Sequence, residues 1–163
     1  MGFRLIGHRG ARNEAPENTL AGFAHARALG LTAIELDLRQ TRDGEVVVIH
    51  DATVDRTTNG SGAVAELSLA ELRTLDARSV HLDWPEAVTI PTLAEVLDWA
   101  GDALFLQIEI KQEPLDRMRA TIDAAVGAIA RRGLQGRVLF SSFDANAVGW
   151  LQERHPAWPR AYV

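Results

Sequence analysis

The chain has 163 residues, which is enough for one domain with a sizeable core, and its 47% hydrophobic and 24% charged residues are ordinary for a globular protein. It contains no cysteine, which excludes disulfides and thiolate zinc sites, and its net charge of −5 argues against a general nucleic-acid binder. No apolar run approaches the roughly 20 residues that a membrane helix needs. We therefore expect a cytoplasmic protein with no stable membrane insertion and no nucleic-acid partner.

Strand and helix signals alternate along the chain. The hydrophobic patterns predict strands over 3–8, 33–38, 46–50, 104–110, 137–140 and 160–163. Caps and helical periodicity predict helices over 18–29, 92–99, 115–129 and 144–154. The stretch over 52–91 departs from this rhythm, because it holds a polar glycine-rich loop and a short helix that begins at the capping box Ser68–Glu71. We interpret residues 52–91 as an insertion on the rim of a single domain that spans residues 1–163.

Alternating strands and helices indicate a parallel sheet covered by helices. In the strand over 33–38, aliphatic side chains alternate with Glu35 and Asp37, and in the strand over 104–110 they alternate with Glu109 and its polar neighbours. An open doubly wound sheet would bury both faces and leave these carboxylates stranded, whereas a β/α barrel gathers polar groups at the carboxyl ends of its strands. The sequence therefore predicts an α/β fold of the (β/α)8 TIM barrel class.

Two of these carboxylates lie two residues apart on one strand, so Glu35 and Asp37 project from the same face. Like charges so close together either share a proton or bind a cation, and Glu109 repeats the pattern on another strand. Three carboxylates without any thiol favour a divalent metal, Mg²⁺ or Ca²⁺, over Zn²⁺. The alternative interpretation is a solvated pair on an edge strand, which the apolar neighbours make less favourable.

Two histidines end strands near this cluster. A two-residue loop at Asp43-Gly44 would place His50 directly opposite Asp37, whereas a longer loop would shift the register and break this placement. Together with His8, which closes the first strand, His50 would supply a general acid and a general base that titrate near neutral pH. Each histidine alone is equally compatible with a plain strand end or a loop anchor.

Two basic residues accompany the carboxylates in the sequence. Arg9 has the geometry to hold a phosphate through two hydrogen bonds, and Lys111 would add a point charge. Either residue is also compatible with a plain surface charge. Their positions beside the predicted acidic cluster favour an anionic ligand.

Taken in order, the polar motifs resemble those of the glycerophosphodiester phosphodiesterase family over essentially the whole chain. The matching motifs are Gly7-His8-Arg9-Gly10, Pro16-Glu17-Asn18-Thr19, Glu35-Leu36-Asp37, His50-Asp51, Asp55-Arg56-Thr57-Thr58-Asn59-Gly60, Glu109-Ile110-Lys111 and Ser142-Phe143. Any one of these motifs is weak, but the ordered set is specific. The resemblance implies a (β/α)8 barrel with a small insertion that hydrolyses small-molecule glycerophosphodiesters to glycerol 3-phosphate and an alcohol.

The resemblance also implies roles for individual residues. The implied metal ligands are Glu35, Asp37 and Glu109, and the implied acid and base are His8 and His50. The implied substrate-binding residues are Arg9, Lys111, Glu17 and Asn18.

Several alternatives stay open at this point. Only about five strands of a barrel are present, whereas a (β/α)8 barrel usually takes around 250 residues, so we expect the chain to be a fragment that lacks the C-terminal strands. An apolar groove around Trp84 would instead suit a phospholipase D-like activity on lysolipids. A non-catalytic remnant that binds phosphodiesters would need no acid–base pair, and a metal-dependent sugar isomerase would have less use for Arg9 and two histidines. The sequence also leaves an oligomer open.

Overall fold

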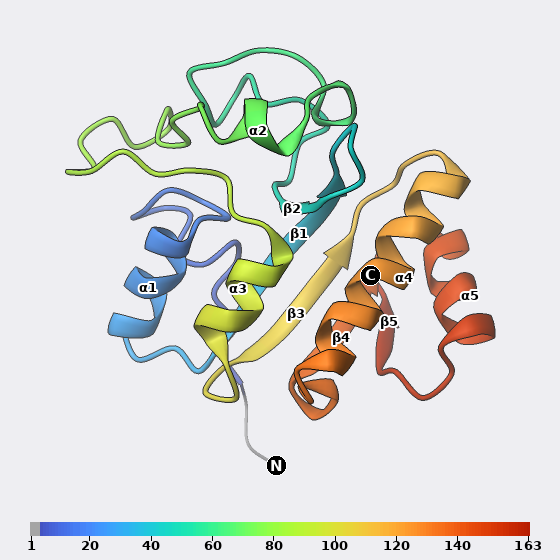
Figure 1. Ribbon diagram of the computed structural model, residues 1–163. Coiled ribbons are helices and arrows are strands. Elements are labelled where there is room, and N and C mark those ends of the chain that lie inside the picture. Colours follow the sequence, from blue (N-terminus) through green and yellow to red (C-terminus); the bar gives the residue numbers. More distant parts are fainter. Residues whose placement is uncertain (1–3) are drawn as a thin grey trace.

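A computed structural model describes residues 4–163 (Figure 1). Within these residues one sheet has five strands, β1 (Ala33–Gln40), β2 (Val46–Val48), β3 (Phe105–Ile110), β4 (Val138–Ser142) and β5 (Arg160–Tyr162). The strand order is β2-β1-β3-β4-β5, with β2 antiparallel to β1 and all other neighbours parallel. The strands predicted from residue 33 onward are therefore confirmed, although β2 ends two residues earlier than predicted.

Helices connect the parallel strands, as the alternation predicts. In the described part of the chain the α-helices are α1 (Leu20–Ala28), α2 (Leu69–Leu72), α3 (Leu93–Ala100), α4 (Leu115–Arg131) and α5 (Ala145–Arg154), and the 3-10 helices are η1 (Val64–Glu66) and η2 (Gln135–Arg137). Both predicted capping boxes are present, at the N-termini of α2 and α3, and Asp144 caps α5. No helix among residues 4–163 is long and apolar enough to span a bilayer.

The alternation within β1 and β3 divides the sheet into an apolar face and a polar face. The aliphatic residues of the two strands pack with α3 and α4 in the main core, where Leu36 and Ile108 are fully buried. The parallel register pairs Leu36 with Ile108 and Asp37 with Glu109. The same alternation that buries the aliphatic residues therefore brings carboxylates of the two strands side by side on the other face.

Residues 52–91, which contain η1 and α2, lie at the end of the sheet toward which β1 and β3 run (Figure 1). They pack around a second, smaller apolar cluster that also includes a residue of β2. The buried members of this cluster are Val47, Ile49, Val54, Val64, Leu72, Ala77 and Ile90. This packing holds residues 52–91 against β2. The interpretation of residues 52–91 as an insertion within a domain that spans residues 1–163 stays a prediction.

The first predicted strand, over residues 3–8, is largely wrong. Phe3 lies outside the described residues, residues 4–6 adopt no regular structure, and Gly7 forms an isolated parallel bridge with Ile34. Among the described residues this segment pairs on one side alone, and Leu5 is left 76% exposed. A pattern of apolar residues is not enough to form a strand where pairing is limited to a single bridge.

The loop that follows Gly7 lies directly on α1. Gly10 has a φ of +85°, and a β-carbon at this position would lie 2.9 Å from Phe23 Cδ1 and 3.0 Å from the Gly22 backbone. Thr19 ends the loop as the N-cap of α1, where its side chain accepts a hydrogen bond from the Gly22 amide. Glycine is therefore required at position 10 by both the backbone conformation and the close approach of the helix.

Gly10→Ala should destabilise the protein more than Gly30→Ala does. Both glycines have a positive φ, which costs an alanine roughly 1–2 kcal/mol, but the described structure leaves open space around a β-carbon at Gly30. At Gly10, the contacts with Phe23 and Gly22 add about 1–3 kcal/mol of overpacking. Urea unfolding followed by circular dichroism measures both changes in the free energy of unfolding. Equal losses in the two variants would contradict the packing argument.

Candidate functional site

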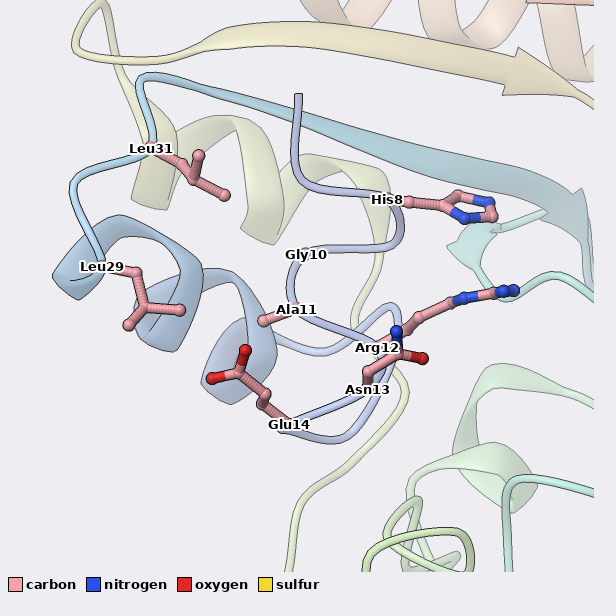
Figure 2. A pocket seen from close by; sticks show the side chains of 8 residues that line it. All are labelled: His8, Gly10, Ala11, Arg12, Asn13, Glu14, Leu29 and Leu31. Carbon is pink, nitrogen blue, oxygen red and sulfur yellow. The ribbon is translucent and has the colours of Figure 1, made fainter. Parts of the chain in front are cut away.

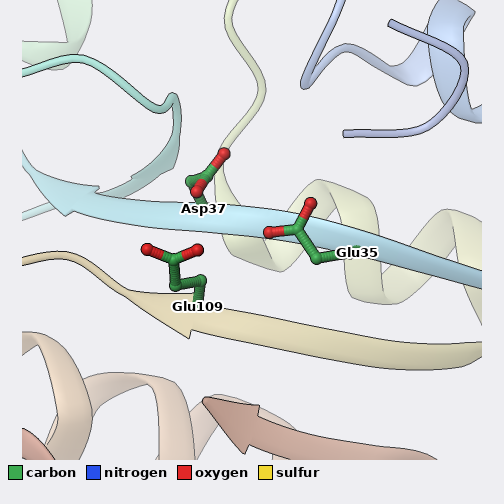
Figure 3. Close-up of side chains that lie close together, drawn as sticks. All are labelled: Glu35, Asp37 and Glu109. Carbon is green, nitrogen blue, oxygen red and sulfur yellow. The ribbon is translucent and has the colours of Figure 1, made fainter. Parts of the chain in front are cut away.

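Three acidic side chains meet on the polar face of the sheet (Figure 3). Glu35 and Asp37 rise from β1 and Glu109 from β3, and one carboxylate oxygen of each lies within 4.8 Å of the others. Glu35 is 6% exposed and Asp37 is fully buried. Burial of this degree excludes a solvated edge-strand pair, and the structure brings together all three carboxylates that the sequence predicts to share a site.

The acidic cluster has the properties of a cation site. Burial raises the pKa of Glu35 to about 8, and the charges of Asp37 and Glu109 add to this effect. Among residues 4–163, Glu35 Oε1 and Asp37 Oδ1 are buried without a hydrogen-bond partner. Such oxygens are unfavourable unless a cation satisfies them. The all-oxygen donor set fits a hard divalent ion such as Mg²⁺ or Ca²⁺, so the cluster is a candidate metal site.

Two basic side chains border the carboxylates. Lys111 Nζ lies 2.5 Å from Glu109 Oε1 and 3.4 Å from Asp37 Oδ1. Arg9 reaches the cluster from the loop before α1, where its backbone amide donates to Glu35 Oε2 at 2.9 Å and its Nε lies 3.4 Å from Asp37 Oδ2. The two positive charges predicted to attend a phosphate therefore lie at the edge of the acidic cluster.

The loop that carries Arg9 is held in a strained shape. Arg9 and Asn18 have φ angles of 53° and 55°, in the left-handed region that residues other than glycine rarely adopt. The Asn18 amide donates to the Arg9 carbonyl at 3.1 Å, which closes the loop. The Asn18 side chain donates to Asp37 Oδ2 at 2.8 Å and accepts from the Asp37 amide at 3.4 Å. These bonds hold the loop against β1, and backbone strain of this kind is concentrated at functional sites.

Glu17 is buried between two arginines. Its Oε1 accepts hydrogen bonds from Arg9 Nη1 at 2.9 Å and from Arg56 Nη2 at 2.7 Å, and its Oε2 accepts from Arg56 Nη1 at 2.9 Å. Burial opposes ionisation of Glu17, but the hydrogen bonds from Arg56 and Arg9 outweigh it and lower the pKa of this carboxyl. Glu17 is therefore ionised at neutral pH, with both oxygens engaged by guanidinium groups.

His8 lies beside the acidic cluster. Its Nε2 is 3.8 Å from Glu35 Oε2, and its side chain is 53% exposed. Partial burial lowers the pKa of His8, and the charges of Arg9 and Arg12 add to this effect.

The predicted pairing of His50 with Asp37 is wrong. The hairpin loop has three residues, 42–44, and its last residue is a glycine with a φ of 87°, as three-residue loops require. The register consequently shifts by one, and the Asp37 carbonyl accepts from the Ile49 amide at 3.1 Å. The carboxylate beside His50 is instead that of Asp51, whose Oδ1 lies 2.6 Å from His50 Nδ1.

Three supporting residues received no role in the sequence analysis. Arg56 Nε donates to Asp51 Oδ2 at 2.6 Å, and the terminal nitrogens of Arg56 donate to Glu17. Arg39 Nε donates to the His50 carbonyl at 2.9 Å. Signals for all three are present in the sequence, since Asp51 and Arg56 belong to the matched motifs and Arg39 continues the polar face of β1.

A cavity of about 320 Å³ opens beside His8 (Figure 2). Its lining residues are His8, Gly10, Ala11, Arg12, Asn13, Glu14, Leu29 and Leu31. His8 and Arg12 lie at one end of this cavity, and Leu29 and Leu31 lie at the other (Figure 2). The three clustered carboxylates do not line it, so the cavity adjoins the candidate metal site through His8.

A largely parallel α/β sheet with polar groups gathered on one face of adjacent strands is typical of β/α-barrel proteins, and its acidic cluster is a candidate metal site. The sequence model of the Glycerophosphoryl diester phosphodiesterase family matches residues 8–163. The chain is 43% identical over 141 residues to a glycerophosphodiester phosphodiesterase of Caldanaerobacter subterraneus subsp. tengcongensis, with 86% of this chain and 58% of the relative covered. The chain belongs to the glycerophosphoryl diester phosphodiesterase family.

Solved structures agree with this assignment. The glycerophosphodiester phosphodiesterase from Agrobacterium tumefaciens is similar with a TM-score of 0.87 at 32% identity, over 96% of this chain and 65% of that chain. An Oleispira antarctica phosphodiesterase in complex with the product sn-glycerol-3-phosphate is similar with a TM-score of 0.87 at 35% identity, over 98% of this chain and 65% of that one. The predicted fold class is confirmed as a partial barrel, and the chain spans less than two thirds of the length of these relatives.

In the absence of metal, Glu35 should make the free energy of unfolding fall as the pH rises from about 4.5 to about 8. Its pKa is higher in the folded state than in the unfolded state, so within this window the folded protein binds a proton that the unfolded chain has released. Glu35→Gln removes the titrating group and should flatten this part of the stability curve. Chemical unfolding in EDTA at a series of pH values measures the difference, and an identical pH dependence in both proteins would contradict the burial argument.

Mg²⁺ or Ca²⁺ should raise the thermal midpoint of unfolding, because a bound cation satisfies the buried oxygens of the folded state alone. At a free ion concentration of 100 times the Kd the gain is about 2.7 kcal/mol. Asp37→Asn keeps the shape of the side chain but removes its charge, and should abolish the shift. Glu153→Gln on the exposed surface of α5 is the matched control. Differential scanning fluorimetry after EDTA treatment measures the shifts, and a full shift in Asp37→Asn would place the ion elsewhere.

Proposed function

We propose that this chain carries the catalytic site of a metal-dependent phosphodiesterase that hydrolyses glycerophosphodiesters to glycerol 3-phosphate and an alcohol. The observation that carries the proposal is the cluster of the buried Glu35 and Asp37 with the partly buried Glu109, which has basic side chains at its edge. The relative from Oleispira antarctica was solved with the product sn-glycerol-3-phosphate, which supports the same product class here.

In this proposal the three carboxylates hold a divalent metal that, when bound, supplies positive charge to a phosphate oxygen. Arg9 and Lys111 add fixed positive charge beside the same group. Contacts with Glu35 and Glu17 hold Arg9 in place, and the contact with Glu109 holds Lys111. Charges oriented in advance stabilise the negative charge that develops on the phosphate oxygens without further reorganisation.

His50 is suited to act as the general base. Burial raises the pKa of Asp51, but hydrogen bonds from Arg56 and His50 outweigh this and lower it to about 2. Because Asp51 is ionised, its 2.6 Å contact places the imidazole proton of His50 on Nδ1 and leaves Nε2 free to accept a proton. The proton comes from the nucleophile, which is water or the substrate's own 2-hydroxyl, and protonated His8 donates to the alcohol oxygen as its bond to phosphorus breaks. Attack by the 2-hydroxyl gives a cyclic phosphate first, which water then opens to glycerol 3-phosphate.

His8→Ala and His50→Ala should each lower kcat by about 10²- to 10⁴-fold, because each removes a proton-transfer group. The matched control is His155→Ala, since His155 bonds Asp123 on the outer helices and should be dispensable for turnover. The measurement is the release of glycerol 3-phosphate from glycerophosphocholine with added Mg²⁺ or Ca²⁺ and after EDTA treatment. Wild-type turnover in either variant would remove that histidine from the mechanism.

Lysophosphatidylcholine is the second substrate to assay, because a lysolipid activity would need an apolar groove near Trp84. The Trp84 ring packs edge-on against His25 with the ring centroids 5.8 Å apart. A ring engaged in this contact favours a packing role over a lipid-binding one. Faster turnover of lysophosphatidylcholine than of glycerophosphocholine would instead favour the lysolipid activity.

A further inference from the structure

We propose that Arg56 is a positioning residue that braces two sides of the site against each other, an inference that rests on the proposed function. Arg56 belongs to the motif Asp55–Gly60, to which neither the metal site nor the acid–base pair gives a task. Its guanidinium group makes three hydrogen bonds to two carboxylates, those of Asp51 and Glu17. Each of these carboxylates in turn holds a residue that the proposed mechanism uses.

On one side, Arg56 fixes the partner of His50. Arg56 Nε donates to Asp51 Oδ2 at 2.6 Å, while Asp51 Oδ1 lies 2.6 Å from His50 Nδ1. A carboxylate that is bound at both oxygens resists rotation about its terminal bond, so the imidazole that it contacts is also held in one orientation. Without Arg56, the side chain of Asp51, which is 28% exposed, would keep only the contact with His50 among the contacts within residues 4–163.

On the other side, Arg56 fixes the partner of Arg9. The two terminal nitrogens of Arg56 bind the two oxygens of Glu17 at 2.7 and 2.9 Å, in the paired geometry that favours arginine over lysine. Glu17 Oε1 also accepts from Arg9 Nη1 at 2.9 Å, and Arg9 Nε lies 3.4 Å from Asp37 Oδ2. The series of contacts from Arg56 through Glu17 and Arg9 therefore ends at Asp37, a carboxylate of the candidate metal site.

The brace connects residues 52–91 with the loop before α1, and no strand pairing in the described part of the chain joins these two segments. Its members, in order of contact, are His50, Asp51, Arg56, Glu17, Arg9 and Asp37. Arg56 comes from residues 52–91, whereas Glu17 and Arg9 come from the loop before α1. The backbone next to His50 is held to β1 by the hydrogen bond from the Ile49 amide to the Asp37 carbonyl. Arg56 thus acts on the side chains, because it joins Asp51, the partner of the proposed base, to Glu17, the partner of Arg9.

The first test is spectroscopic and does not need turnover. The proton between His50 Nδ1 and Asp51 should give a far-downfield resonance in the proton NMR spectrum, and His50→Ala should remove it and so assign it. Arg56→Gln should also abolish the resonance. The matched control is Arg42→Gln. Arg42 also bonds residues of the 52–91 segment, Glu71 and the Glu66 carbonyl, but these bonds involve neither Asp51 nor Glu17.

The second test is kinetic. Arg56→Gln should lower kcat about 10- to 100-fold, the usual effect of removing a group that orients a site residue. Arg56→Lys keeps the positive charge but lacks the planar guanidinium group that bonds two carboxylates at once, so its kcat should stay close to that of Arg56→Gln. Added guanidinium ion should restore part of the activity of Arg56→Ala but none of the activity of His50→Ala.

The outcomes separate the brace from the proposed function. An unchanged resonance, or wild-type kcat in both Arg56→Gln and Arg56→Lys, overturns the positioning role. If circular dichroism shows that Arg56→Gln is unfolded, Arg56→Lys supplies the same comparisons. If the resonance depends on Arg56 but the wild-type chain releases no glycerol 3-phosphate, the proposed function fails and the brace stands.

Discussion

The parallel pairing of Asp37 with Glu109 is the constraint on which the site depends. It places carboxylates of neighbouring strands in contact, and strand alternation adds Glu35 to them. Burial of like charges costs several kcal/mol per ion unless opposite charges or a cation compensate it, and Lys111 and Arg9 border the cluster in that role. The aliphatic faces of the same two strands pack into the main core, and this burial offsets the remaining cost.

Different forces position the two kinds of functional group. The carboxylates are fixed by backbone pairing within the sheet, which leaves them little freedom. The histidines and Arg9 are carried by loops, where hydrogen bonds between side chains and backbone strain take the place of pairing. A loop can hold a proton-transfer group accurately only if its side chains are bonded on more than one side, and His50 meets this condition through Asp51 and Arg39.

Local patterns were sufficient to predict most of the fold and the acidic cluster. The alternation in β1 and β3 identifies both the buried face and the carboxylates, because side-chain direction in a strand depends only on position along it. The position of His50 was predicted wrongly because the hairpin loop is one residue longer than the predicted two-residue loop. The conformation of the segment before Gly7 depends on which strands pair with it, and a local pattern does not reveal this. The role of Arg56 arises from contacts between distant loops, which leave no periodic signal in the sequence.

The alternation of charge around Glu17 has a consequence for how the family can change over evolution. Glu17 separates two guanidinium groups, so its replacement by a neutral residue would leave the buried Arg9 beside the cation of the partly exposed Arg56 with no anion between them. Replacement of Arg9 or Arg56 would leave a buried anion with one counter-charge fewer. Divergence at these three positions should therefore be concerted, with compensating substitutions accepted together and single substitutions rare.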